Sequence, residues 1–81
     1  MSSTSSPQSL PLSMAGENAR VRIVALLGGP GTVRRLTEMG LNVGCEIIVR
    51  QSQGGGLVVS RGETRFALGA GMAHKIMVCP V

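Results

Sequence analysis

The side chains that could take part in catalysis are few in this chain of 81 residues. The chain has one histidine, His74, and two cysteines, Cys45 and Cys79. Its acidic residues are glutamates at positions 17, 38, 46 and 63, and it has no aspartate. A nucleophile needs a base beside it and an acid that orients the base. Because the glutamates are scattered and each lies near an expected helix or strand surface, the sequence predicts no catalytic set, and we do not expect an enzyme.

Metal binding is the next chemistry that these residues could support. His74, the two cysteines and the methionines are possible soft ligands. The spacing from His74 to Cys79 matches no closed zinc pattern. A structural thiol near a strand end and an exposed histidine are the simpler interpretation. We therefore expect no cofactor and no metal site within one molecule. His74 and Cys79 are the weak candidates, and a surface histidine could still bridge two molecules through a metal.

The composition indicates one small domain with a thin core and a basic surface. Hydrophobic residues make up 43% of the chain, charged residues 15%, and the net charge is +4. Such a charge suits a polyanion or an acidic protein surface. However, Phe66 is the only aromatic residue, whereas proteins that bind single-stranded nucleic acid stack bases on aromatic side chains. We therefore expect the arginines to lie on solvated strand faces, with no nucleic acid partner.

The N-terminal residues and the apolar runs bear on location. Residues 1–9 form a Ser-rich polar tail, which we expect to be disordered, and residues 10–81 form the domain. The tail has neither the basic nor the apolar region of a signal peptide. The longest apolar run, Ile23 to Leu27, is too short to cross a bilayer. The expected protein is cytoplasmic, with reduced cysteines and no membrane insertion.

A short helix is predicted from Thr32 to Met39. Thr32 can cap its N-terminus, because the hydroxyl can accept a hydrogen bond from a free backbone N–H. Val33, Leu36 and Met39 recur at every third position and would share one side of the helix. This side is expected to face the core.

The residues after the helix carry signals for two tight turns. Gly40 ends the helix, since glycine adopts the left-handed conformation without a Cβ clash. Leu41 then stands where a Schellman motif places an apolar contact with Leu36. Gly44 occupies the position of a type II turn that needs a positive φ.

Arg34, Arg35 and Glu38 fall on the opposite side of this helix, and two interpretations of them remain open. Arg34 and Glu38 are four residues apart and could form a weak surface pair. Alternatively, the arginines form a docking surface for a carboxylate or phosphate partner. Composition alone does not decide between the two.

The rest of the domain reads as short strands separated by turns. In the first strand, alternate residues from Val21 to Leu27 would face the core. Val24 and Leu26 would fall on the outer face, which is then partly covered or used for contact. A small, partly open antiparallel barrel suits such a chain, because closure protects sheet edges. The five predicted strands are Ala19 to Leu27, Cys45 to Gln51, Leu57 to Arg61, Thr64 to Leu68 and Lys75 to Cys79.

The segment Arg34 to Leu41, which reads RRLTEMGL, resembles the signature of the ferrous iron transport protein A family (FeoA), with Gly44 following it. The resemblance covers about Pro11 to Val78. The chain departs from the family pattern at Val43, where proline is frequent. Further matching segments are Leu12-Ser13, Gly16-Glu17, Val21 to Leu26, Arg65 to Leu68 and Ala73 to Val78.

The resemblance implies an all-β fold with one short helix, an SH3-like barrel of about five strands. It also implies a small regulatory protein of ferrous iron uptake, acting through a membrane ferrous iron permease and its GTP-binding domain. Family-level transition metal ion binding is a weak expectation. The expected protein is a monomer or weak homodimer, cytoplasmic or at the inner face of the membrane through its partner.

The surface expected to meet the permease combines the outer helix face with apolar residues of the first strand. It consists of Arg34, Arg35, Glu38, Val24 and Leu26. Two other functions stay open: a small basic barrel that binds nucleic acid, and a stand-alone relative of the C-terminal domain of metal-dependent repressors. The absence of aromatic stacking residues argues against the first. The chain also has no helix-turn-helix segment.

Overall fold

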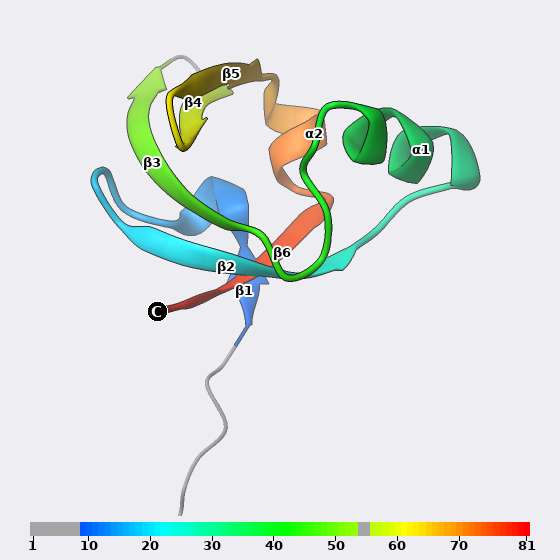
Figure 1. Cartoon of the computed structure of the whole chain (residues 1–81), viewed down its shortest axis with the longest axis horizontal. Helices are drawn as coiled ribbons and strands as arrows, with labels where there is room; N and C mark the ends of the chain where they lie inside the picture. The colour runs from blue at the N-terminus through cyan, green and yellow to red at the C-terminus, as the bar shows by residue number, and fades with distance from the viewer. Residues whose placement is uncertain (1–8, 54–55) are drawn as a thin grey trace, which may run out of the picture.

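The computed structural model describes residues 9–53 and 56–81 as a curled antiparallel sheet with three short helical segments (Figure 1). The six strands lie in the order β1-β6-β2-β3-β4-β5. The predicted disordered tail comprises residues 1–9, of which 1–8 lie outside the described residues. The elements are β1 Leu10–Pro11, the 3-10 helix η1 Leu12–Met14, β2 Arg20–Leu26, α1 Pro30–Glu38, β3 Glu46–Gln53, β4 Gly56–Arg61, β5 Thr64–Leu68, α2 Ala70–Ala73 and β6 Ile76–Pro80.

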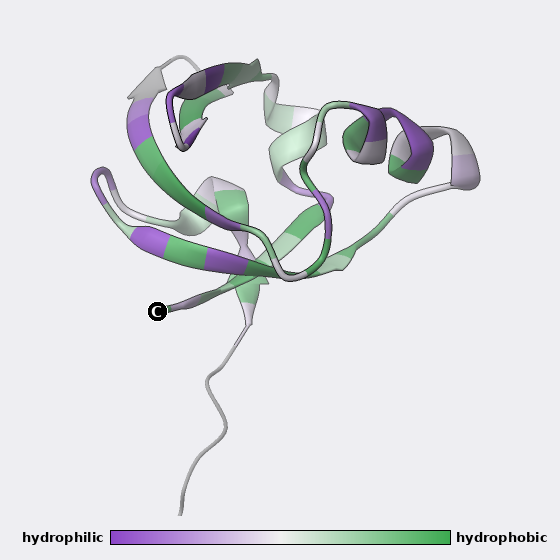
Figure 2. Cartoon of the chain, viewed as in Figure 1, coloured by the Kyte–Doolittle hydropathy of each residue, from purple (hydrophilic) through white to green (hydrophobic). Residues whose placement is uncertain are grey.

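The sheet curls around one apolar core, and the predicted fold class is confirmed. Figure 2 shows hydrophobic and hydrophilic bands alternating along β2, as expected for a strand with one buried face. The edge strands β1 and β5 are not hydrogen-bonded to each other, so the barrel stays open. The buried apolar residues are Leu12, Val21, Ile23, Leu36, Leu41, Ile47, Val49, Leu57, Val59, Leu68, Ala73, Ile76 and Val78.

The predicted strand count was one too low. Leu10 and Pro11 pair with Val78 and Met77 of β6 and form the additional strand β1. Two residues give too little alternation to be recognised as a strand in sequence. The adjoining Leu12 is fully buried, which anchors the start of the domain.

The described helices include none long and apolar enough to span a membrane.

A β-bulge at Val24 reverses the faces of the end of β2. Ile23 pairs with Val78, whereas Ala25 already pairs with Met77, so β2 has one extra residue. After this residue Leu26 packs against the core, while Leu27 is 47% exposed. The prediction that Leu27 faces inward and Leu26 outward was therefore wrong. A continuous alternation cannot foresee a bulge, because the extra residue is set by the partner strand.

The helix α1 begins two residues earlier than predicted. Gly29 occupies the N-cap and Pro30 the first helical position, and no side chain caps the end. Proline fits there because its missing N–H is one that the helix leaves unpaired. The predicted capping by Thr32 was wrong, since Thr32 already lies inside the helix.

The predicted Schellman motif at the end of α1 is confirmed. Gly40 has a φ of +89°, the N–H of Gly40 donates to the carbonyl of Thr37 at 2.9 Å, and the N–H of Leu41 donates to that of Leu36 at 2.9 Å. Leu36 and Leu41 are both fully buried. The helix end is therefore fixed by backbone bonds and by the burial of both side chains in the core.

The turn at Gly44, also confirmed, ties the segment after α1 to β2. Gly44 has a φ of +96°, and the N–H of Cys45 donates to the carbonyl of Asn42 at 3.0 Å. The N–H of Gly44 donates to the carbonyl of Ile23 at 2.7 Å, and the N–H of Ile23 donates to that of Cys45 at 2.9 Å. Gly44 and Cys45 thus both oppose Ile23, which is a G1 bulge led by glycine.

The remaining strands lie close to the predicted ranges. β3 extends to Gln53 and β4 starts at Gly56, so the predicted hairpin loop is shorter than expected, and positions 54 and 55 lie outside the described residues. At the next hairpin Gly62 has a φ of +61° and occupies the first central position of the turn, where type II′ needs glycine.

Truncation of Leu36 tests the anchoring of α1. Leu36→Ala should lower the free energy of unfolding by about 2–5 kcal/mol, because it leaves a cavity in a thin core. Urea unfolding followed by circular dichroism measures the change. Thr37→Ala, on the exposed side of α1, is the matched control and should stay within about 0.5 kcal/mol of the parent. Equal stability of the two variants would show that α1 is not anchored through Leu36.

Alanine at two glycines should have opposite effects. Gly40→Ala should destabilise by about 1–2 kcal/mol, because a Cβ is strained at a φ of +89°. Gly31→Ala lies inside α1 with no atom within 4 Å of the new Cβ, and it should stabilise by up to about 1 kcal/mol. Thermal unfolding of both variants measures the difference. A Gly40→Ala protein as stable as Gly31→Ala would contradict the Schellman geometry.

Candidate partner-binding surface

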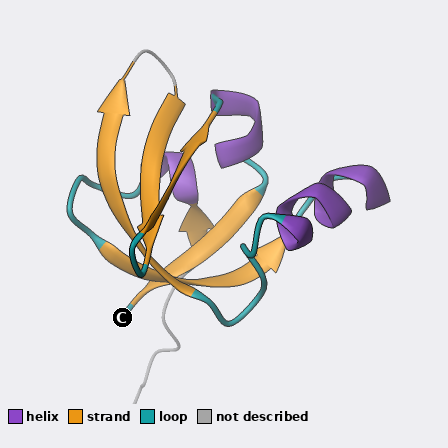
Figure 3. Cartoon of the chain, turned by 45° about the horizontal axis from the view of Figure 1, so that its top comes forward, coloured by secondary structure: helices purple, strands orange, loops and turns teal. Residues whose placement is uncertain are grey.

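The helix α1 projects from the open barrel (Figure 3). Its polar residues Arg34, Arg35, Thr37 and Glu38 are exposed. Arg34 Nε donates to Glu38 Oε2 at 3.3 Å, and these two side chains are 79% and 66% exposed. Such a pair contributes about 0.3–0.5 kcal/mol at most. The weak surface pair expected from the sequence therefore forms, and it can be broken by a partner at little cost.

Arg35 has a different environment from Arg34. It makes no ion pair with any described residue. Together with Gly31, Thr32 and Met72 it lines a groove of ≈ 360 Å³ between α1 and α2. The groove therefore offers an unneutralised guanidinium beside a half-buried thioether, which suits a partner that brings a carboxylate and some apolar area.

Lys75 adds a second cation near this groove. Its Cδ would lie 3.1 Å from a Cβ on Gly28, and the side chain of Thr32 would lie 3.3 Å from the same Cβ. Gly28 has a φ of +97° and connects β2 to α1, so glycine is required there for conformation and for space. The close packing of Lys75 and Thr32 around Gly28 fixes the start of α1 next to α2. Lys75 was not among the residues selected from the sequence.

The apolar part of the predicted surface is only partly present. Val24 is 37% exposed at the bulge, but Leu26 packs inward against the core and cannot offer the area expected of it. Val43 is 60% exposed. Because Gly44 is hydrogen-bonded to Ile23, Val43 and Val24 lie on adjoining segments at the C-terminal end of α1. In the sequence, Val43 stands out only because it departs from the family pattern, and it was not predicted to lie on this surface.

The structure separates the residues that were considered as metal ligands. His74 caps the end of α2, and its Nδ1 lies 3.0 Å from Ser13 Oγ. Cys79 lies towards the other end of β6, where it pairs with Arg22 of β2. Cys45 Sγ donates to the carbonyl of Gly40 at 3.4 Å. Over the described ranges 9–53 and 56–81, no group of three or more His, Cys, Asp or Glu side chains could hold a metal ion.

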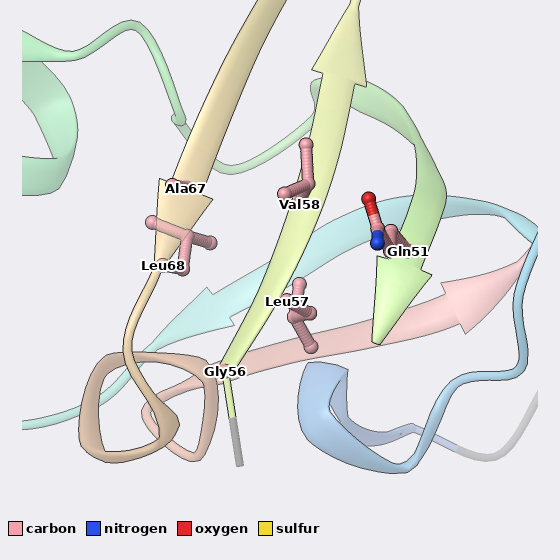
Figure 4. Close-up of a pocket in the computed structure, with 6 residues that line it drawn as sticks. All are labelled: Gln51, Gly56, Leu57, Val58, Ala67 and Leu68. Carbon is pink, nitrogen blue, oxygen red and sulfur yellow. The ribbon is translucent and has the colours of Figure 1, made fainter. Parts of the chain in front are cut away.

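A second depression, of ≈ 200 Å³, lies on strands β3, β4 and β5 (Figure 4). Among the described residues that line it, Gln51 has the only polar side chain, so those residues supply no group for acid–base or nucleophilic chemistry. Its lining residues are Gln51, Gly56, Leu57, Val58, Ala67 and Leu68.

The profile of the FeoA domain family matches residues 10–80, nearly all of the described chain. The chain belongs to the FeoA domain family. Residues 10–80 include the helix α1, its Schellman motif and both predicted arginines, so the family match extends over the whole candidate surface.

Two relatives are similar to this FeoA domain over most of their length. "Putative Fe(2+) transport protein A" of Methanocaldococcus jannaschii is 37% identical over 68 residues, which are 84% of this chain and 83% of the relative. A crystal structure of an iron uptake regulatory protein, FeoA, superposes with a TM-score of 0.83 and 36% identity. That superposition covers 91% of this chain and 99% of the other.

The same fold occurs inside larger proteins. A manganese-dependent transcriptional repressor superposes with a TM-score of 0.85 at 16% identity, over 95% of this chain and 44% of the repressor chain. At that identity the likeness concerns the fold alone. The SH3-like barrel therefore does not by itself indicate a function.

Iron titration tests the prediction that one molecule holds no tight metal site. Ferrous iron added anaerobically to the reduced protein should give no saturable micromolar binding by calorimetry, since the candidate ligands lie apart. His74→Ala serves as the matched sample and should give the same heats. One tight equivalent in the parent that is absent from His74→Ala would overturn the prediction.

Proposed function

We propose that this FeoA domain is a non-enzymatic accessory protein of ferrous iron uptake. It acts by docking on the cytosolic GTP-binding part of a membrane ferrous iron permease, which holds it at the inner face of the membrane. The observation that carries the proposal is its similarity to proteins named for Fe(2+) transport and iron uptake regulation, over nearly the full length of both chains.

The shape of the molecule supports a role in docking. The barrel interior is filled with side chains, so a partner must be met on the outside. The helix α1 projects furthest from the sheet, and it carries the two predicted arginines. Of these, Arg35 lines the groove against α2 and has no ion pair in the described chain, whereas Arg34 is already bonded to Glu38. We therefore assign the central contact to Arg35 and the rim to Arg34, Glu38, Val24 and Val43.

Binding of single-arginine variants to the isolated GTP-binding domain tests this assignment. Arg35→Ala should weaken binding by about 2 kcal/mol, or about 30-fold, because it removes a central charged contact. Arg34→Ala should change affinity by about threefold or less, since exposed rim charges contribute little. Arg35→Lys should not restore the parent affinity if the guanidinium binds a carboxylate through two hydrogen bonds. Calorimetry in each nucleotide state measures the affinities.

Arg65→Ala is the control, because it removes one positive charge from the edge strand β5 and leaves α1 unchanged. It should bind like the parent, and all variants should retain the parent circular dichroism. If Arg35→Ala binds like Arg65→Ala, the docking surface lies elsewhere on the molecule. If the parent binds in no nucleotide state, docking on the permease is wrong.

A further inference from the structure

A row of paired residues crosses four strands on the outer face of the sheet. Arg20 of β2 pairs with Ile48 of β3, Ile48 pairs with Ser60 of β4, and Ser60 pairs with Arg65 of β5. Paired residues of antiparallel strands project from the same face. Arg20 and Arg65 therefore mark the two ends of one row, about 14 Å apart along the curved sheet at three strand spacings.

Two further arginines flank this row. Arg22 follows Arg20 on the same face of β2 and donates to Glu46 Oε2 at 2.9 Å. Arg50, the extra residue of a bulge in β3, donates from Nε to Ser60 Oγ at 3.0 Å. The hydroxyl of Ser60 is buried beneath this contact, which holds Arg50 across the face. We call Arg20, Arg22, Arg50 and Arg65 the arginine face.

The arginine face carries a positive charge. Its four arginines contribute +4, and the carboxylate of Glu46, which pairs with Arg22, reduces the sum over these five residues to +3. Within the described residues Arg20 and Arg65 make no ion pair. Positive charge concentrated on one face requires a reason, because like charges repel and destabilise the folded state.

The side chains of the arginine face suit some classes of anionic partner better than others. It has no aromatic side chain on which a base could stack. Its centre consists of half-buried Ile48 and buried Ser60, so it lacks the exposed apolar anchor around which tight protein–protein contacts form. Spread charges without a pocket suit a surface of many mobile anionic groups. We propose that the arginine face binds the anionic headgroup surface of a lipid bilayer.

The expected attraction is weak and electrostatic. Each arginine near an anionic bilayer strengthens binding by about fivefold, and the effect falls off within a Debye length. The face therefore orients the protein on a membrane and concentrates it there, without inserting. This inference needs no permease, so it can fail independently of the proposed function.

Vesicle co-sedimentation of the full chain tests the proposal. The protein should bind vesicles of mixed phosphatidylglycerol and phosphatidylcholine, should not bind pure phosphatidylcholine vesicles, and should be released as salt is raised. Arg20→Gln with Arg65→Gln should weaken binding by about 25-fold, fivefold for each arginine. The matched control, Arg34→Gln with Arg35→Gln, removes the same charge from α1 and should bind within about threefold of the parent.

Three outcomes would overturn the proposal, and one measurement checks that the variants are folded. Equal loss in the two double variants means that net charge, and not the arginine face, drives adsorption. No sedimentation with anionic vesicles at low salt rules out a bilayer as the partner. Duplex DNA or polyglutamate that binds tighter than vesicles, with the same dependence on Arg20 and Arg65, assigns the face to a nucleic acid or an acidic protein. Unchanged thermal unfolding of both double variants establishes that they are folded.

Discussion

The burial of Leu36 and Leu41 in the barrel core is the constraint on which the organisation of this domain depends. It closes the Schellman motif at the end of α1, and both side chains join the barrel core. Leu41 lies three residues before the bulge at Gly44. Its burial therefore also positions Gly44 and Cys45 for their hydrogen bonds with Ile23 of β2. A helix of nine residues would not persist in water without such an anchor.

The position of this anchor explains why α1 can present a surface. The helix is anchored near its C-terminal end by Leu36 and Met39, and in its first turn Thr32 packs beside Gly28 and Lys75. Leu36 is the buried residue of α1, whereas Arg34, Arg35, Thr37 and Glu38 are exposed. A polar helix side held in place at both ends loses little conformational freedom on binding, which favours a specific contact.

The arginine face and the helix face suit partners of different chemistry. The helix offers one unneutralised guanidinium beside a groove, which suits a defined carboxylate, whereas the sheet offers several arginines without a pocket. The two lie on different elements, and one molecule can use both at once. A membrane-bound partner and the lipid around it would then restrain the domain from two sides.

The sequence by itself determined the features that are encoded locally. Gly40 and Gly44 predicted the helix end and the type II turn, because only glycine meets their φ values without strain. The spacing of Val33, Leu36 and Met39 predicted the burial of Leu36 and the partial burial of Met39 against the core, whereas Val33 is only half-buried and does not pack against the core. Alternation predicted most strand ranges. The fold class followed, since short strands around one helix leave few ways to bury an apolar face.

The tertiary structure decided what depends on pairing between distant segments. The bulge at Val24 is set by the register with β6, so the inward turn of Leu26 could not be read from β2 alone. Arg34 and Arg35 could be distinguished only from the position of Met72 on α2, which lines the groove beside Arg35. Likewise, Arg20 and Arg65 are 45 positions apart in the sequence, and three strand pairings bring them into one row. Sequence encodes local backbone conformation directly, whereas a surface is assembled by register, which only the folded sheet fixes.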